Sequence, residues 1–363
     1  MAESGLDSVL VFGDSAEYGN LVYLSNFIPF TRAALVVSKE KDDPPVIVTD
    51  AILHGEPINS YSWMTFIKDF RPVHHDPSEF SHALNQALAE QHAKRVGIVG
   101  EDTLPISIWE KLKSENNMQW NDFWFEFTKM KSVRSDLEIS LQKEVGKITS
   151  AAMKAAVEFI SPGRTESEVA AEAYKVMFAL GAHDRSFQTI VNGGPRGGLK
   201  HSYPTSRRIE KGDLIYLDMG AMKFGYQCDM SRSVVPGGAN FDQGQVLDLI
   251  LKAFTELTSM MCPGVSTGEI ISRAKKLEDE QSALKAKYSG RMFLGLVVHH
   301  AIATSFFEFP SLGLPDVILE KNMSFAFEPM AHILDFGTAV IEDTILITER
   351  GAESLTPYEI VHW

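Results

Sequence analysis

Short apolar runs alternate with amphipathic segments through the first third of the chain. The apolar runs are rich in Val, Ile and Leu and occupy residues 8–13, 32–38, 44–50 and 95–100. Residues 81–95 and 105–115 instead place apolar side chains three and four positions apart, which is typical of a helix with one buried face. This alternation predicts a small α/β domain.

A polar and basic segment, residues 127–138, ends this pattern. Ser135 and Glu138 form a capping box, in which the side chains satisfy the free backbone N–H groups at the start of a helix. Helical spacing then continues to about residue 160. Because 363 residues exceed what one hydrophobic core usually supports, we expect two domains, 1–130 and 131–363.

The second domain repeats one arrangement of signals. In residues 161–169 and again in 262–270, a Pro-Gly pair ends one helical pattern and a capping box begins the next. Each box pairs a hydroxyl residue with a glutamate three positions later, Thr165 with Glu168 and Ser266 with Glu269. Two β-rich runs follow in each half. One interpretation is two copies of a helix–helix–hairpin plan; the other is unrelated helix breaks, which are common.

The β-rich runs of the first half, residues 213–235, are mostly apolar yet carry two acids. If the chain turns at Lys223 and Phe224, the pairing of a hairpin places Asp218 opposite Asp229. Residues that face each other directly have Cβ atoms about 5 Å apart, and like charges at that distance are destabilising. The predicted hairpin therefore requires a compensating positive charge.

The second half, residues 323–348, gives the same result. A turn centred on Asp335 places Glu328 opposite Glu342, and two histidines precede this pair in residues 294–310. Any single acid is explained as a solvated residue of an edge strand. Two acid pairs with a histidine favour a different interpretation, because carboxylates and imidazole bind divalent cations and bridging carboxylates hold two ions about 3.5–4 Å apart.

Composition narrows the classes of function. Hydrophobic residues make up 44% of the chain and charged residues 23%, which is typical of a globular protein. A formal net charge of -14 argues against nucleic-acid binding. There is no long apolar run and no basic, apolar leader, so we expect a cytoplasmic protein with no membrane partner. Cys228 and Cys262 are too few for a disulfide framework, and we expect them to be small packed residues.

The region from about residue 130 resembles the pita-bread metallopeptidases, which include methionine aminopeptidase, aminopeptidase P and prolidase, with creatinase as a non-peptidase relative. The first hairpin matches the family motif at Asp218, Gly220, Gly225, Tyr226, Asp229 and Arg232, with Ser231 where the family carries Thr. The histidine motif is matched more loosely, at His300, Ile302, Glu308 and Pro310. The first third resembles the N-terminal domain of the prolidase and creatinase branch, so the resemblance covers both domains.

The resemblance implies a small N-terminal α/β domain, 1–130, followed by a pita-bread catalytic domain of α+β character, 131–363, with an internal pseudo-twofold repeat. It also implies two divalent metal ions with five ligands, namely Asp218, Asp229, His300, Glu328 and Glu342. By this resemblance Asp218 binds one ion, His300 and Glu328 bind the other, and Asp229 and Glu342 bridge them. We expect Mn²⁺, although such an oxygen-rich set also accepts Zn²⁺ and Co²⁺.

The family chemistry is hydrolysis by a metal-activated water, with Glu328 shuttling the water proton. His201 lies 17 residues before Asp218 and matches the family histidine that steadies the tetrahedral intermediate or protonates the leaving group. Taken without the family, His201 is a surface-loop histidine. The resemblance therefore makes His201 and Glu328 the predicted catalytic residues.

Some positions are ambiguous or depart from the family. His299 and His300 are adjacent, and the spacing to Glu-x-Pro favours His300 as the ligand. The proline-specific members carry a second histidine where this chain has Phe307, and an arginine where it has Val340. His332 follows Glu328 closely enough to reach the site. We therefore assign substrate binding to Phe307, His332 and Val340.

Three functions are compatible with these residues. The first is an Xaa-Pro dipeptidase or aminopeptidase. The second is a non-peptidase hydrolase or lyase acting on a small nitrogenous or sulfonium metabolite, which the apolar Phe307 and Val340 favour. The third is a binding module that has lost catalysis, against which the complete ligand set and His201 argue. We predict a metal-dependent hydrolase acting on a dipeptide or other small molecule, and, from the family, a homodimer.

Overall fold

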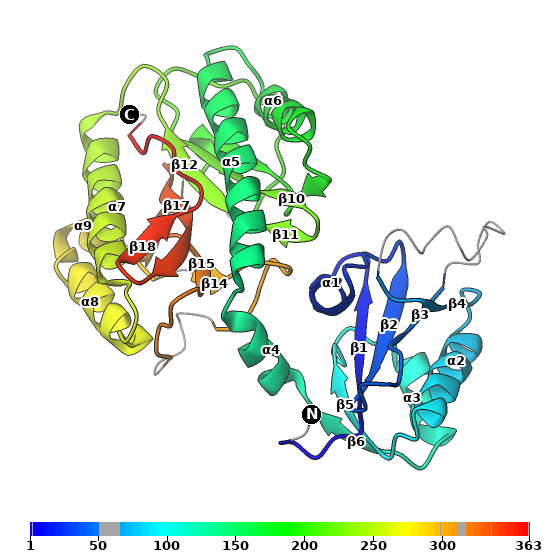
Figure 1. The fold of residues 1–363 in the computed structure, drawn as a ribbon. Coiled ribbons are helices and arrows are strands. Elements are labelled where there is room, and N and C mark those ends of the chain that lie inside the picture. The colour runs from blue at the N-terminus through cyan, green and yellow to red at the C-terminus, as the bar shows by residue number, and fades with distance from the viewer. Residues whose placement is uncertain are drawn as a thin grey trace. The chain divides into compact units, whose positions relative to one another are not determined.

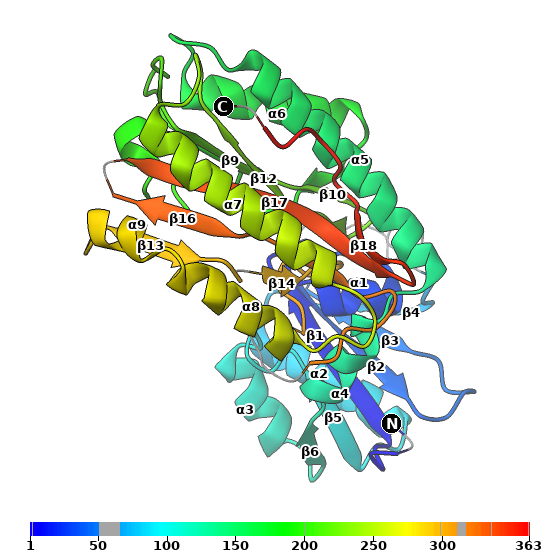
Figure 2. The ribbon, with the colours of Figure 1, turned by 90° about the vertical axis from the view of Figure 1, so that its left-hand side faces the viewer.

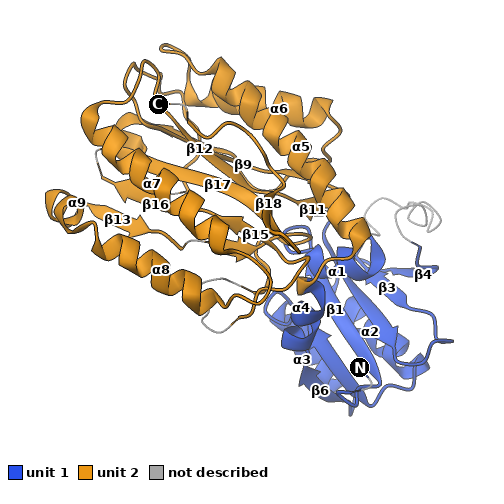
Figure 3. Ribbon diagram, turned by 60° about the vertical axis from the view of Figure 1, so that its left-hand side comes forward, with its two compact units in different colours: residues 1–131 blue, residues 132–363 orange. Residues whose placement is uncertain are grey.

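The computed structural model describes residues 1, 3–50, 66–199, 201–297, 299–310, 317–334, 336–361 and 363. The chain forms two compact units, Met1–Lys131 and Ser132–Trp363, which Figure 3 colours separately. The expected division was near residue 130. Within the described ranges, no helix combines the length and apolar character needed to span a bilayer.

Unit 1 is a mixed sheet with helices on its faces (Figure 1). In chain order its elements are β1 (Ser8–Asp14), α1 (Gly19–Ser25), β2 (Arg32–Ser38), β3 (Val46–Thr49), β4 (Asp69–Pro72), α2 (Pro77–Glu90), β5 (Arg95–Val99), α3 (Ile106–Ser114), β6 (Gln119–Asp122) and α4 (Trp124–Ser132). The strands lie in the order β4-β3-β2-β1-β5-β6. The four predicted strands are β1, β2, β3 and β5, and the two predicted helices are α2 and α3, which confirms the α/β expectation.

A hydrophobic core lies on each face of this sheet, and successive side chains of β1 alternate between the two cores. Leu10 and Phe12 belong to the core beneath α2 and α3, whereas Val9 and Val11 belong to the core that includes Leu21 of α1. A strand covered on both faces is apolar at consecutive positions, which is why residues 8–13 formed an unbroken apolar run.

Unit 2 contains the remaining elements. They are α5 (Asp136–Phe159), α6 (Glu166–Ala179), β7 (Asp184–Arg185), β8 (Ile190–Gly193), η2 (Gly194–Arg196), β9 (Ile215–Met219), β10 (Ala221–Lys223), β11 (Tyr226–Gln227), β12 (Met230–Val234), α7 (Phe241–Met260), α8 (Thr267–Asp279), α9 (Ser282–Lys287), β13 (Met292–Gly295), β14 (His299–Ala301), β15 (Ser324–Phe327), β16 (Met330–Ile333), β17 (Gly337–Thr348) and β18 (Gly351–Ser354). The main sheet runs β13-β16-β17-β12-β9-β8, with β15 and β18 also paired to β17. The long strand β17 therefore organises the unit.

The two halves of unit 2 follow the same helix–helix–hairpin plan. All three predicted capping boxes form, at the starts of α5, α6 and α8. The segments before α6 and α8 also make equivalent contacts: the N–H of Gly163 donates to Ile209 O, and the N–H of Gly264 donates to Leu319 O, each at 2.9 Å. The structure thus confirms the internal repeat that the Pro-Gly breaks and capping boxes indicated.

Helices cover one face of the main sheet in unit 2. Leu217 and Met219 of β9 pack in the core formed with α5 and α6. Ile341 of β17 packs in the core formed with α7 and α8, and α7 runs along β17 (Figure 2). Because side chains alternate along a strand, Asp218 and Glu342 point to the opposite face.

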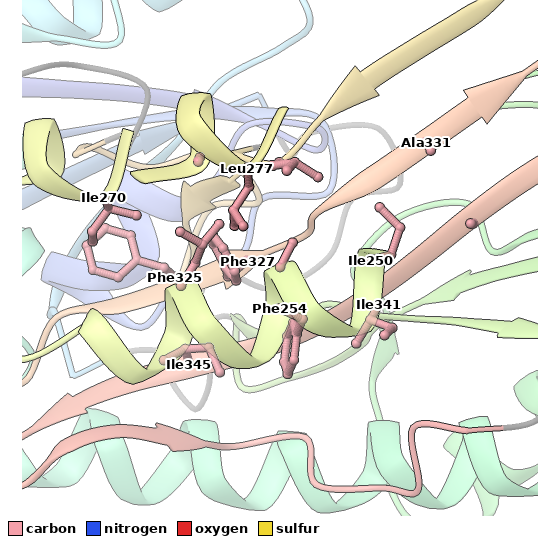
Figure 4. Packing of buried hydrophobic residues seen from close by; sticks show 14 of the residues in the cluster. Ile250, Phe254, Ile270, Leu277, Phe325, Phe327, Ala331, Ile341 and Ile345 are labelled. Atoms are coloured by element: carbon pink, nitrogen blue, oxygen red, sulfur yellow. The ribbon is translucent and has the colours of Figure 1, made fainter. Parts of the chain in front are cut away.

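Aromatic packing fixes the strands beneath α7 and α8 (Figure 4). The rings of Phe254 on α7 and Phe327 on β15 lie 6.1 Å apart between centroids, and Ile270 and Leu277 of α8 belong to the same core. Phe327 immediately precedes Glu328, so burial of the ring on the helix side directs the next side chain toward the other face.

Candidate metal centre

The first hairpin carries its two acids on one face, but in a different register from the predicted one. Asp218 pairs with Ser231, not with Asp229, so the predicted direct opposition is wrong by two residues. The chain turns at Phe224 and Gly225, which both have positive φ, at 53° and 81°. Such a turn matches the twist of a hairpin and favours glycine as its second residue, which explains the shift by one position from Lys223 and Phe224. A slip of two residues leaves both acids on the same face.

Gly220 allows the strands to approach each other beside these acids. A Cβ at this position would lie 1.9 Å from the carbonyl oxygen of Cys228, so no larger residue fits. The close approach falls where β9 passes into β10 and β11 into β12. The glycine two positions after Asp218 is therefore required by packing.

The second hairpin keeps the predicted register. Phe327 pairs with Asp343, and Met330 pairs with Val340, so Glu328 between them faces Glu342. Asp335, on which the turn was centred, lies outside the described residues. The two hairpins therefore bring four acids to one face of the sheet.

Five side chains meet there in two groups. Asp229, His300 and Glu342 form one triad whose ligand atoms lie within 4.8 Å of one another, and Asp218, Glu328 and Glu342 form the other. The two triads share Glu342, which is the arrangement expected of a bridging carboxylate. The resemblance assigned Glu328 to the ion of His300, whereas in the structure Glu328 lies in the triad of Asp218.

Hydroxyl groups hold two of these carboxylates. The hydroxyl of Ser231 donates to Glu342 Oε2 at 2.7 Å. The hydroxyl of Tyr216 donates to Asp218 Oδ2 at 2.6 Å and lies 3.3 Å from Glu328 Oε1. Ser231 was expected only as a replacement for Thr, and Tyr216 was not predicted from the sequence. The signal for Tyr216 was its place two residues before Asp218 on a strand, which puts both side chains on one face.

Burial and mutual repulsion oppose ionisation of the acids. Burial, reinforced by Glu342, Asp218 and Glu328, raises the pKa of Asp229 well above its usual range. Burial, reinforced by Glu328 and Asp218, does the same to the pKa of Glu342. Burial, followed by Asp218 and Glu328, also raises the pKa of Tyr216, which keeps its hydroxyl protonated as a donor.

The five residues fit divalent metal ions. Asp229 Oδ1 is buried and makes no hydrogen bond to the residues that the structure describes. His300 Nε2 lies 3.7 Å from Asp229 Oδ2, close enough for both to reach one ion. Carboxylate oxygens with one imidazole nitrogen are ligands that Mn²⁺, Zn²⁺ and Co²⁺ accept. Two such ions would supply the positive charge that the hairpins require.

His300 and His299 occupy different environments. His300 belongs to the triad with Asp229, and its Nδ1 lies 3.2 Å from the carbonyl oxygen of Ala301. His299 is buried, and burial together with His300 lowers the pKa of His299 to about 3. Successive side chains on β14 face opposite ways, so only His300 is directed to the acids.

A cavity of about 370 Å³ opens over the acids. His201 lies in its wall together with Asp218 and Glu328, although His201 is 17 residues distant from Asp218 in sequence. His201 has a φ of 56°, a conformation uncommon for a residue other than glycine and often associated with functional sites. The structure thus brings both predicted catalytic residues to one cavity.

Aromatic rings form the apolar part of the cavity wall. The centroids of Phe306 and Phe307 lie 4.7 and 4.6 Å from that of His300, and Phe187 lies 4.8 Å from Phe306. Phe307 is 70% exposed. Of these rings only Phe307 was predicted to bind substrate. Phe187 and Phe306 were not predicted, because a lone aromatic residue is more often a core residue.

Val340 and His332, the other two residues assigned to substrate binding, lie away from the cavity wall. Val340 is fully buried in a cluster with Ile190, Tyr216 and Met330. His332 is buried too, and its Nδ1 hydrogen-bonds to the hydroxyl of Thr338. Both lie on the face of the acids, but their side chains pack among neighbours instead of lining the described cavity.

Two protein-family models match this chain, one in each of its two units. Residues 140–349 match metallopeptidase family M24, and residues 1–128 match the creatinase/prolidase N-terminal domain. An Xaa-Pro dipeptidase of Pyrococcus horikoshii is 28% identical over 99% of this chain and 95% of its own length. An Xaa-Pro dipeptidase of Pyrococcus furiosus is 32% identical over 74% of this chain and 75% of its own length.

Solved structures agree with these matches. The prolidase of Pyrococcus horikoshii has a TM-score of 0.83 and 26% identity, covering 99% of this chain and 96% of that chain. The prolidase of Pyrococcus furiosus has a TM-score of 0.82 and 25% identity, covering 99% of this chain and 98% of that chain. These matches confirm the pita-bread fold, and the chain belongs to metallopeptidase family M24 and is a metal-dependent peptidase.

Proposed function

We propose that this metallopeptidase hydrolyses Xaa-Pro bonds in dipeptides and short peptides, with two ions held by Asp218, Asp229, His300, Glu328 and Glu342. The observation that carries the proposal is the pair of triads that share Glu342 at the cavity lined by His201. The relatives named Xaa-Pro dipeptidase support the substrate class. Membership of a peptidase family weighs against the non-peptidase alternative and against an inactive module.

Two residues of the cavity wall, Glu328 and His201, move protons in the proposed reaction. Divalent ions at such a site polarise a carbonyl group and lower the pKa of water. Glu328 accepts the proton of the attacking water at a carboxylate oxygen while the water oxygen bonds to the carbonyl carbon. His201 donates to the substrate carbonyl oxygen or to the leaving nitrogen as the C–N bond breaks.

The aromatic wall suits an apolar residue beside the scissile bond. Phe187, Phe306 and Phe307 offer ring faces and edges next to His300, and apolar surface removed from water there contributes about 25 cal/mol per Å². A pyrrolidine ring is compact and apolar, so it packs against such a wall without needing a charged partner. This supports proline, and it predicts tolerance of other apolar residues at that position.

The finer properties of the protein are also proposals. We propose Mn²⁺ as the working ion because four of the five ligands are carboxylates. We propose a cytoplasmic location, supported by two cysteines that are both free. We retain a homodimer from the family resemblance, to be tested by light scattering on the purified protein.

Metal analysis and peptide hydrolysis test the function together. Metal content is measured by elemental analysis, and Mn²⁺-loaded protein is then assayed on matched Xaa-Pro and Xaa-Ala dipeptides. We expect bound metal and faster cleavage of the Xaa-Pro series. Bound metal without cleavage of any peptide would overturn the substrate assignment, and a protein that binds no metal would overturn the site.

The Asp229→Ala variant sharpens this test. Asp229 lies in one triad and faces the other acids, so its removal is expected to abolish metal binding and activity together. The matched control is Asp248→Ala, an acid exposed on α7, which should keep both properties. Full activity in Asp229→Ala would contradict the assignment.

A further inference from the structure

Tyr216 is a tyrosine buried among the acids that no comparison assigns a role. It lies on β9 two positions before Asp218, so the two side chains share a face of the sheet. Its hydroxyl donates to Asp218 Oδ2 at 2.6 Å and lies 3.3 Å from Glu328 Oε1. One hydroxyl therefore contacts two of the three residues in the second triad.

Packing holds the Tyr216 ring in one place. The ring is fully buried in a cluster with Ile190 of β8, Met330 of β16 and Val340 of β17. On a further side the ring of His332 meets it edge-on, with centroids 6.4 Å apart and planes at 73°. A ring enclosed by neighbours on three strands cannot swing, so the position of the hydroxyl is fixed by the sheet itself.

The contact joins the two halves of the repeat. Asp218 belongs to the first hairpin and Glu328 to the second, and these residues are 110 positions apart in sequence. Two carboxylates that repel each other turn apart unless a donor holds them. The single proton of the hydroxyl satisfies Asp218, and the phenolic oxygen stays within hydrogen-bonding distance of Glu328.

We propose that Tyr216 is a positioning residue that orients the metal ligands Asp218 and Glu328, which belong to different hairpins. The inference rests on the metal site of the proposed function and goes beyond its five ligands. Partners that hydrogen-bond to metal ligands fix the orientation of those ligands, and losing such a partner typically costs about 10–100-fold in metal affinity.

Tyr216→Phe tests this because it removes only the hydroxyl. Metal-free protein is titrated with Mn²⁺ in competition with a chromophoric chelator, and we expect binding to weaken about 10-fold or more. The Co²⁺-loaded variant should also show an altered visible spectrum, since the ligand geometry changes. Thermal unfolding of the metal-free protein reports separately on folding.

Tyr226→Phe is the matched control. Tyr226 is also buried and lies in the same hairpin, but it packs in the core formed with α5 and α6 and belongs to neither triad. This control should bind Mn²⁺ as the unsubstituted protein does. A Tyr226→Phe variant that loses as much affinity as Tyr216→Phe would reduce the effect to general loosening of the hairpin and overturn the inference.

A second variant keeps the test open if Tyr216→Phe does not fold. Val340→Ala removes one wall of the ring pocket while leaving the hydroxyl and all five ligands in place, and we expect a smaller loss of Mn²⁺ affinity. If Tyr216→Phe folds and its Mn²⁺ affinity is unchanged, the positioning role is overturned while the metal site stands. If only Val340→Ala folds, unchanged affinity in that variant has the same consequence. Absence of Mn²⁺ binding in the unsubstituted protein would overturn the proposed metal site, and this inference with it.

Discussion

Two adjacent acids on β17 are both buried, but their charged neighbours differ. Glu342 and Asp343 are exposed by only 2% and 4%, and they point to opposite faces of the sheet. On the helix side, Asp343 forms an ion pair with the buried Arg232 at 2.8 Å. On the cavity side, Glu342 receives a hydroxyl hydrogen bond from Ser231, and its charged neighbours are acids.

The two environments act differently on the two carboxyl groups. Burial raises the pKa of Asp343, and Arg232 opposes that rise. Burial also raises the pKa of Glu342, but Glu328 and Asp218 add to the rise. Arg232 thus neutralises Asp343, whereas the acids beside Glu342 favour a bound cation at that side of the sheet. One face of β17 is therefore organised for stability and the other for metal binding.

The largest effect is expected from Glu342→Gln. An amide in place of the carboxylate removes the ligand shared by both triads, so metal binding and peptidase activity should fall by more than the roughly 100-fold that losing an outer partner costs. The metal-free variant should be no less stable than the unsubstituted protein, because one repelling charge is gone. Isothermal titration with Mn²⁺ and thermal unfolding measure the two properties. A strongly destabilised variant that still binds metal would reverse the comparison.

The matched substitution one residue later, Asp343→Asn, should do the opposite. It leaves the Arg232 guanidinium buried without its counter-charge, and breaking a buried pair in this way costs about 3–5 kcal/mol of unfolding free energy. Metal affinity should change little, because Asp343 points away from the triads. Chemical denaturation measures the free energy. Stability equal to that of the unsubstituted protein would show that the buried pair contributes nothing.

A more gradual effect is expected from pH in the metal-free protein. The raised pKa values of Asp229 and Glu342 mean that the folded state holds more protons than the unfolded chain once pH exceeds about 4. Their contribution to stability is present below that pH and is lost as pH rises through the raised values, at about 1.4 kcal/mol per pH unit for each extra proton.

Unfolding free energies measured from pH 4 to 8, with and without Mn²⁺, test this dependence. Bound ions favour the charged carboxylates, so the metal-loaded protein should lose less stability as pH rises. The difference between the two curves isolates the site from the other titrating groups of the chain. Parallel curves would show that the pKa values of Asp229 and Glu342 are not raised in the folded, metal-free protein.

Some residues of the candidate site could be predicted from the sequence pattern, and others could not. Asp218, Asp229, Glu328 and Glu342 were found because acids on apolar strands conflict with burial. His201 was assigned by resemblance alone, and only the cavity places it beside the acids. The first register was wrong because hydrophobic alternation is unchanged by a slip of two residues. Only the turn geometry at Phe224 and Gly225 decides between the two alternatives.

The residues predicted to bind substrate show what a sequence motif does not determine. Phe307, Val340 and His332 were chosen as departures from or additions to a family motif, and only Phe307 lines the described cavity. Val340 packs against Tyr216, a residue 124 positions earlier that no local pattern connects to it. Which side chain reaches a cavity depends on packing between strands, and packing is decided by residues distant in sequence.

By itself the sequence determined the main helices and strands and the face on which each acid lies, and it indicated the repeat, because helix caps, Pro-Gly breaks and the two-residue period of strands act over a few neighbouring positions. The tertiary structure decided the rest. It paired Asp218 with Ser231, gave Glu342 to both triads, sent His300 to the acids and His299 to the core, and placed the Tyr216 hydroxyl against Asp218 and Glu328. These contacts join strands that are far apart along the chain, and only the assembled sheet fixes their distances.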